Sequence, residues 1–113
     1  MSDRWISSFL AAQSADLNAA RNTILAYGRD LKDFSLWANH RGLSFDTLPR
    51  AAVEDYLVAC DADGLSKSTR ARRLSSIRQM FRFAHDEGWR ADNPALRITG
   101  PGASQRLPKT LSI

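Results

Sequence analysis

The sequence predicts an all-α domain built from four helices. In four separate runs, apolar residues recur at spacings of three and four, the period of an amphipathic helix, and nothing in the sequence is typical of a β-hairpin. Glycine, proline and serine separate the runs, as they do where helices begin and end. With 113 residues, 43% of them hydrophobic, the chain has the size of one domain with a modest core.

The first helix is expected to run from Ser2 or Asp3 to about Gln13. Either Ser2 or Asp3 can cap it, because both have a side-chain oxygen that accepts from a free backbone N–H. The residues expected to face the core are Ile6, Phe9 and Leu10.

The second helix is expected from Ala20 or Arg21 to His40, and Gly42 ends it. Its apolar stripe is long, about four turns: Ile24, Tyr27, Leu31, Phe34 and Ala38. Gly28 lies inside this helix, where glycine costs about 1 kcal/mol relative to alanine. Either it allows another backbone to come close, or it is simply tolerated, and the sequence leaves both open.

The third helix is expected over Arg50–Ala62, with Pro49 in its first turn and Gly64 closing it. Four residues at helical spacing are expected to face inward: Val53, Tyr56, Leu57 and Cys60. Cys60 at such a position is interpreted as a core residue.

The fourth helix is expected to be capped by Ser66 or Ser68, to run to about Glu87 and to be stopped by Gly88. Trp89 is expected to fold back onto the core. The apolar stripe of this helix consists of Leu74, Ile77, Phe81 and Ala84.

Residues 1–90 are therefore predicted to form the helical domain, and residues 91–113 an extended basic linker toward a further domain. Prolines and glycines interrupt the linker repeatedly, at positions 94, 100, 101, 102 and 108. Its basic residues include Arg97, Arg106 and Lys109, against the single acidic Asp92.

Positive charge is concentrated in the fourth helix. The chain carries a net charge of +4, whereas residues 66–82 alone contain six basic side chains and no acidic one, so the remainder is net negative. The six are Lys67, Arg70, Arg72, Arg73, Arg78 and Arg82. A chain polarised in this way presents one cationic face, which attracts phosphate backbones.

The residue types on that face suit duplex DNA. Ser68 and Thr69 offer hydroxyls at a helix N-terminus, a natural phosphate site. Arginine and glutamine side chains can bond the edges of guanine and adenine in the major groove. On the fourth helix the candidates continue with Arg70, Arg72, Arg73, Ser76 and Gln79, and on the second helix the same theme appears in Asn22, Thr23 and Arg29.

Catalytic and metal-binding patterns are not found. His40 and His85 have no cysteine or carboxylate at a ligand spacing, and there is no glycine-rich phosphate loop or nucleophile elbow. Asp30 and Asp33 share a face but are interpreted as solvated, beside Arg29 and Lys32. We expect no cofactor, no metal and no catalysis by this chain alone.

The sequence also bears on location. We expect no signal peptide and no membrane span, since no run approaches the roughly 20 apolar residues that a span requires. A single cysteine, Cys60, indicates a reducing compartment, the cytoplasm.

Alternatives remain open at this point. The basic face can be a solvated helix surface with surplus arginine. The chain can be a stand-alone DNA-binding regulator, because Asp63–Lys67 is compatible with the turn of a helix-turn-helix. It can also be a protein-interaction module whose basic face meets an acidic partner. Charge does not exclude RNA, but the exposed aromatic pairs that stack single-stranded bases are missing.

Three stretches in this order carry a family resemblance: NTILAYGRDLKDFSLWANHRGL, SKSTRARRLSSIRQMFRFAHDEGWRADNPA and QRLPKTLS. Together they resemble the N-terminal core-binding domain of the tyrosine recombinases, in particular the Xer-type recombinases and related integrases. The resemblance implies a SAM-like helical bundle that clamps one side of a recombination half-site. A C-terminal catalytic domain closes from the other side, and protomers assemble into a tetramer on double-stranded DNA.

Carried over by position, the resemblance places the second and fourth helices on the DNA. It adds Tyr27 to the contacts of the second helix, and Arg106 and Lys109 as linker residues that track the phosphates. Gly28 departs from the family, which often has a charged residue there. The family's catalytic arginine, lysine, histidine and tyrosine residues lie in the C-terminal domain and map onto nothing here. The chain is thus expected to bind DNA and not to cut it.

Overall fold

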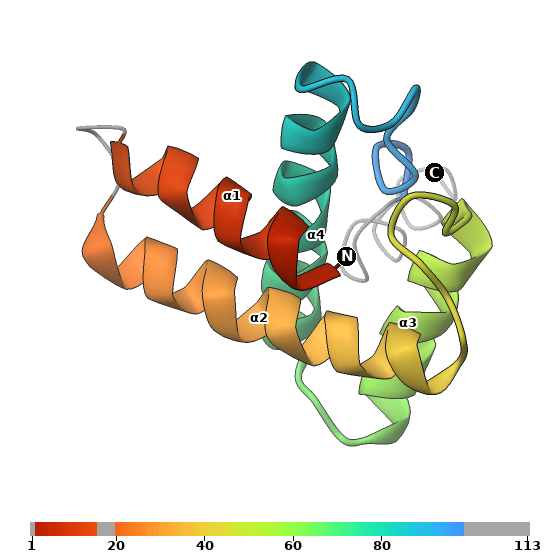
Figure 1. The fold of residues 1–113 in the computed structure, drawn as a ribbon. Helices are drawn as coiled ribbons and strands as arrows, with labels where there is room; N and C mark the ends of the chain where they lie inside the picture. Colours follow the sequence, from red (N-terminus) through yellow and green to blue (C-terminus); the bar gives the residue numbers. More distant parts are fainter. Residues whose placement is uncertain (1, 16–19, 99–113) are drawn as a thin grey trace, which may run out of the picture.

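The computed structural model describes residues 2–15 and 20–98, and these residues contain four α-helices and no strand. They are α1 (Ser2–Ala15), α2 (Arg21–His40), α3 (Arg50–Ala62) and α4 (Lys67–Asp86). The predicted all-α class is confirmed. Figure 1 shows α1 and α2 lying side by side and antiparallel, with α4 crossing behind them and α3 on the far side of α4 from the start of α2.

Helix α4 is the centre of the domain, since it packs against each of the other three helices. Its buried apolar residues are Leu74, Ile77, Met80, Phe81 and Ala84. They meet a cluster of aromatic rings around Phe34 of α2. The Phe34 ring centroid lies 5.4 Å from that of Phe45, 4.9 Å from that of Tyr56 and 6.5 Å from that of Phe81. One aromatic side chain thus joins α2, α3, α4 and the loop before α3.

The helix ends follow local signals. Ser66, rather than Ser68, caps α4: its backbone is extended and its hydroxyl accepts from the N–H of Thr69 at 3.2 Å. Pro49 is the residue before α3 and not part of its first turn, which corrects the prediction by one position. Gly42, which follows α2, has a φ of +69°, a conformation that glycine adopts without strain.

Gly28 allows α1 and α2 to pack closely. A Cβ atom at this position would lie 3.3 Å from Cδ1 of Leu10 on α1, closer than side chains ordinarily approach. The neighbour of Gly28 is thus the tip of a side chain on α1 and not another backbone. The cost of glycine inside a helix is offset by contact between two helices.

The chain after α4 folds back onto the bundle. Trp89 packs against Trp5 at 5.2 Å and Phe83 at 5.4 Å between ring centroids, as predicted. Further on, Ala95 and Ile98 are buried.

Arg78 of α4 holds this segment in place. Its guanidinium donates to the carbonyl oxygens of Ala95 and Ile98, and the Asn93 amide donates back to the carbonyl of Arg78 at 3.2 Å. The packed segment reaches at least Ile98, because an arginine 17 and 20 residues earlier in the chain donates to the carbonyls of Ala95 and Ile98. Residues 99–113, with Arg106 and Lys109, lie outside the described residues.

Two expectations about individual features can be compared with the structure. Cys60 is a buried free thiol, which confirms it as a core residue. Among the described residues, none of the helices has the length and apolar character needed to span a membrane.

The position of Phe34 gives a stability prediction. Phe34→Ala should lower the free energy of unfolding by about 3–5 kcal/mol, because it removes a fully buried ring on which four segments pack. Urea unfolding followed by tryptophan fluorescence measures this. Leu36→Ala, on the same helix but 53% exposed, is the matched control and should change stability by about 0.5 kcal/mol or less. Equal losses in both variants would contradict the assignment of Phe34 to the core.

Candidate nucleic-acid interface

The predicted DNA-binding arginines of α4 meet a buried carboxylate on α2. Asp30 is 1% exposed, so the interpretation of this residue as solvated was wrong. The Arg72 guanidinium donates two parallel hydrogen bonds to the Asp30 carboxylate: Nε donates to Oδ2 at 3.1 Å and Nη2 donates to Oδ1 at 2.9 Å. Ser76 adds a third bond, from its hydroxyl to Oδ2 at 2.9 Å. The carboxylate is therefore paired and bonded, as a buried charge must be.

A second group of bonds extends this pairing to α3. Arg73 donates from Nη1 to Oδ2 of Asp33 at 2.7 Å and to the hydroxyl of Tyr56 at 3.0 Å. The Tyr56 hydroxyl donates to Oδ2 of Asp33 at 2.6 Å. Burial, and then this bond to Asp33, raise the pKa of Tyr56 well above its ordinary value. The residues Asp30, Asp33, Tyr56, Arg72, Arg73 and Ser76 form one polar network, which we call the three-helix network.

Several of the predicted contact residues are thus turned inward. Ser76 is 1% exposed, so in this fold its hydroxyl faces Asp30 and not a bound duplex. The side chain of Arg73 is 19% exposed. The side chain of Arg70 is 12% exposed and its Nη1 lies 2.7 Å from Asp61 of α3. Arg78 holds the segment after α4. The cationic helix expected from the sequence is therefore largely bonded within the domain.

Other predicted residues remain at the surface. On α2, Asn22, Thr23 and Arg29 are exposed, whereas Tyr27 is half-buried with its ring 5.5 Å from that of Phe9. On α4, Ser68 is exposed, and Thr69 and Gln79 are half-buried. The Arg72 side chain keeps 55% of its surface exposed although it is bonded to Asp30.

Four polar residues of α4 form a stripe at spacings of four, three and four, the first three exposed and the last half-buried: Ser68, Arg72, Ser75 and Gln79. Ser75, not Ser76, is the serine on this stripe, and the predictions missed it. The bond between Arg72 and Asp30 joins the stripe to the middle of α2. We call Asn22, Thr23, Arg29, Ser68, Arg72, Ser75 and Gln79 the α2–α4 surface.

The N-termini of the two helices differ. The Ser66 hydroxyl accepts from the Thr69 N–H, and the two hydroxyls lie 3.1 Å apart, so both take part in the cap of α4. At α2 the residue before the helix is Ala20, which supplies no side-chain cap. Within the part of the chain that the structure describes, no side-chain acceptor is seen for the first N–H groups of α2, beside Asn22 and Thr23. A phosphate oxygen is a suitable partner for such groups.

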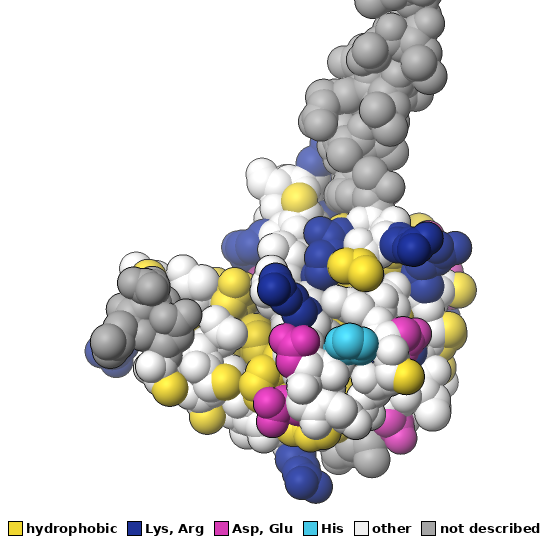
Figure 2. Space-filling view, turned by 90° about the horizontal axis from the view of Figure 1, so that it is seen from above, with side chains coloured by type: hydrophobic (Ala, Val, Ile, Leu, Met, Phe, Trp, Pro, Cys, Tyr) yellow, Lys and Arg dark blue, Asp and Glu magenta, His cyan; other side chains and the backbone are white. Residues whose placement is uncertain are grey.

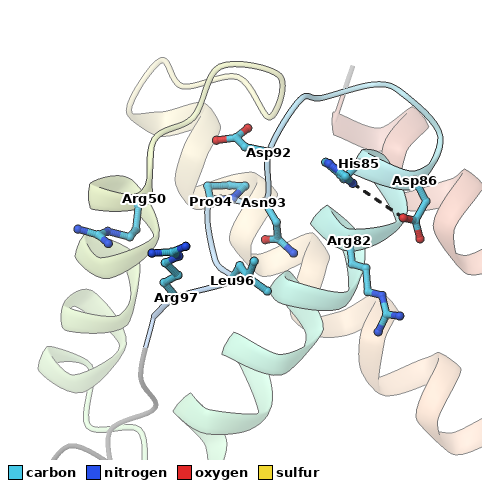
Figure 3. Close-up of a pocket in the computed structure, with 9 residues that line it drawn as sticks. All are labelled: Arg50, Arg82, His85, Asp86, Asp92, Asn93, Pro94, Leu96 and Arg97. Carbon is cyan, nitrogen blue, oxygen red and sulfur yellow. Dashed lines mark ion pairs between the residues drawn. The ribbon is translucent and has the colours of Figure 1, made fainter.

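A hollow of about 670 Å³ lies at the other end of α4. Figure 3 shows Arg82, His85 and Asp86 reaching it from α4, Arg50 from the start of α3, and the segment 92–97 crossing it. Figure 2, which looks onto this end of the molecule, shows most of its arginine and lysine side chains gathered on one half, while acidic side chains and a histidine lie mainly on the other. We call it the α3–α4 hollow. It was not predicted, because its lining comes from three separate parts of the sequence.

Metal binding gains no support from the described part of the chain. No group of three or more histidine, cysteine or acidic side chains lies close enough there to hold an ion. Asp92, which lines the α3–α4 hollow, is bonded to Arg90 at 2.7 Å, and this bond lowers the pKa of Asp92.

Comparison with known proteins identifies the class. The model of the phage integrase N-terminal SAM-like domain matches residues 6–88, and the chain belongs to this family. The resemblance noted from the sequence is thereby confirmed.

Curated relatives share the name tyrosine recombinase XerD. The protein of Caulobacter vibrioides is 39% identical over 109 residues, covering 96% of this chain and 36% of the relative. That of Rhizobium meliloti is 37% identical over 113 residues, covering 100% and 36%. That of Bradyrhizobium diazoefficiens is 41% identical over 105 residues, covering 93% and 33%. The chain spans about a third of the length of these relatives.

The three-helix network yields a pH prediction. Tyr56→Phe should lower the free energy of unfolding by about 1–2 kcal/mol near neutral pH, because Arg73 and Asp33 lose a buried partner. The pKa of Tyr56 is raised in the folded state, so its contribution is complete below roughly pH 10, the ordinary tyrosine pKa, and is lost as pH rises above it.

The measurement is denaturant unfolding of the native chain and of the Tyr56→Phe variant from about pH 8 to about pH 11. The difference between the two should shrink by up to about 1.4 kcal/mol per pH unit once the unfolded tyrosine ionises. Comparing the two chains cancels the titration of every other group. A difference that stays constant across this range would show that Tyr56 is not held protonated by the fold.

Proposed function

We propose that the chain binds duplex DNA through the α2–α4 surface, as the N-terminal DNA-gripping domain of a site-specific tyrosine recombinase. The observation that carries this proposal is the polar stripe of exposed Ser68, Arg72 and Ser75 and half-buried Gln79, which a buried ion pair between Arg72 and Asp30 fixes on α2. Membership of the phage-integrase SAM-like family and likeness to XerD recombinases support it. Strand cleavage is assigned to residues outside this chain.

The proposed contacts divide into two kinds. Asn22, Thr23 and Ser68 suit phosphate oxygens, because they are exposed donors in the first turns of two helices, and Arg29 is an exposed cation about two turns further along α2. Arg72 and Gln79 are the residue types that bond purine edges in the major groove, and an α-helix such as α4 fits that groove.

The remaining predicted residues take other places in the proposal. Tyr27 and Thr69 are half-buried supports beside the contacts. Arg70 and Arg73 hold α4 in place beneath the contacts, being 12% and 19% exposed and paired with Asp61 and Asp33. Ser76 is removed from the contacts because it is buried. Arg106 and Lys109 stay proposals for a linker that follows the DNA backbone.

The partners follow from the proposed role. They are a recombination half-site, a catalytic domain in the same protein and further protomers assembled on the DNA. A cytoplasmic location, where bacterial DNA lies, suits the proposal and the free, buried Cys60.

The first test of this function is salt dependence. The affinity for a fluorescently labelled duplex, followed by anisotropy, should fall linearly with the logarithm of salt concentration as counterions are released. Arg29→Ala should lower the magnitude of the slope by about 1, the value for one lost phosphate contact. Arg4→Ala, an exposed arginine on α1 outside the α2–α4 surface, is the matched control and should leave the slope unchanged. An affinity independent of salt would refute nucleic-acid binding.

The second test concerns base reading. Gln79→Ala should reduce the preference for a selected duplex over a scrambled one by roughly 1–3 kcal/mol, the value of one bidentate base contact. Ser75→Ala, on the same stripe but with a shorter side chain, should weaken both duplexes alike. If Gln79→Ala also weakens binding to the two duplexes equally, this side chain contacts the DNA backbone and reads no base.

A further inference from the structure

Asp30 is the one member of the three-helix network that is both charged and buried, and no DNA contact accounts for it. We propose that Asp30 is a positioning residue: it fixes the Arg72 guanidinium so that the outer edge of this group faces the duplex. Asp30 thereby raises sequence selectivity while lowering non-specific attraction. This inference rests on the proposed function.

The donors of Arg72 support this arrangement. A guanidinium has five N–H donors in a planar fork. Asp30 takes two of them, one on Nε and one on Nη2, at 3.1 and 2.9 Å. The two donors on Nη1 and the second on Nη2 remain, and the side chain is 55% exposed. One donor on Nη1 and the remaining donor on Nη2 lie along the outer edge, which can bond guanine or a phosphate with two parallel bonds, while the other Nη1 donor points back toward Cδ.

The carboxylate is itself immobile. Asp30 is 1% exposed, and the Ser76 hydroxyl bonds the same Oδ2 atom that accepts from Arg72. Arg72 is thus anchored at its inner edge to a residue 42 positions earlier in the chain. Most of its conformational freedom is lost on folding and not on binding, which is how preorganisation favours the correct complex.

The charge of Asp30 has a second consequence. It offsets the charge of Arg72 next to the surface, so the pair attracts DNA of any sequence less than a free arginine does. Removing the charge should therefore act in two opposite directions: stronger binding to any duplex, and weaker discrimination between duplexes. Loss of a purely structural residue would weaken binding to every duplex and discrimination between duplexes together. A positioning role and a structural role for Asp30 therefore predict different results.

The test uses the 113-residue chain and two probes. One is a duplex that the chain itself selects from a random-sequence pool, and the other is a scrambled duplex of the same composition. With Asp30→Asn, which keeps the shape but not the charge, the scrambled duplex should bind more tightly and with a salt slope steeper by up to about 1. The ratio of the two affinities should fall by roughly tenfold.

Three variants separate positioning from folding. Asp33→Asn, the same change one turn further along α2 at a 50% exposed side chain, should leave the affinity ratio unchanged. Arg72→Lys keeps the charge but lacks the planar fork, so it should lose selectivity and keep non-specific affinity. In the Arg72→Lys background, Asp30→Asn should then change selectivity little further.

The outcomes can be told apart. If the native chain binds no duplex, the proposed function fails and this inference with it. If the native chain binds but prefers no sequence, or if Asp30→Asn leaves the affinity ratio unchanged, the proposed function stands and the inference is overturned. If circular dichroism shows that Asp30→Asn does not fold, the Ser76→Ala and Arg72→Lys variants replace it in the test. Sequence selectivity equal to that of the native chain in both variants would then overturn the inference.

Discussion

The ion pair between Asp30 and Arg72 is the constraint on which the rest of the domain depends. An ionised carboxylate with 1% exposure is strongly unfavourable unless a cation and hydrogen bonds meet it. Only one setting of α4 on α2 brings Arg72 and Ser76 to Asp30 together. That setting also turns Leu74, Ile77 and Phe81 into the core, so the polar and apolar demands on α4 agree.

The same constraint changes how much positive charge the basic helix presents at the surface. Four basic side chains of α4 have partners inside the domain: Arg70, Arg72, Arg73 and Arg78. The helix therefore presents less unpaired positive charge than its composition indicates. What it presents is a small number of donors in fixed places. A surface of this kind favours orientation over attraction, which suits the proposed role of holding one DNA site in one geometry.

Arg78 shows a further use of a basic side chain. Its guanidinium binds the carbonyls of Ala95 and Ile98, so the segment after α4 is held against the helix that carries the proposed DNA contacts. The direction of the chain beyond α4 is thereby coupled to the position of the α2–α4 surface. The same packing forms the α3–α4 hollow, whose arginines come from two helices and this segment.

Helix positions and core faces could be predicted from the sequence, because both depend on neighbours in the chain. The period of apolar residues, the Ser66 cap and the glycine after each of the last three helices are local signals, and α2 and α3 begin and end as expected. The candidate site was predicted only in part. Whether an arginine faces DNA or a carboxylate depends on a partner some 40 residues away, as for Arg72 and Arg73. The sequence by itself therefore determined which helices carry the polar faces. The tertiary structure alone decided which of those side chains remain at the surface, because a buried charge requires a partner that only folding brings near.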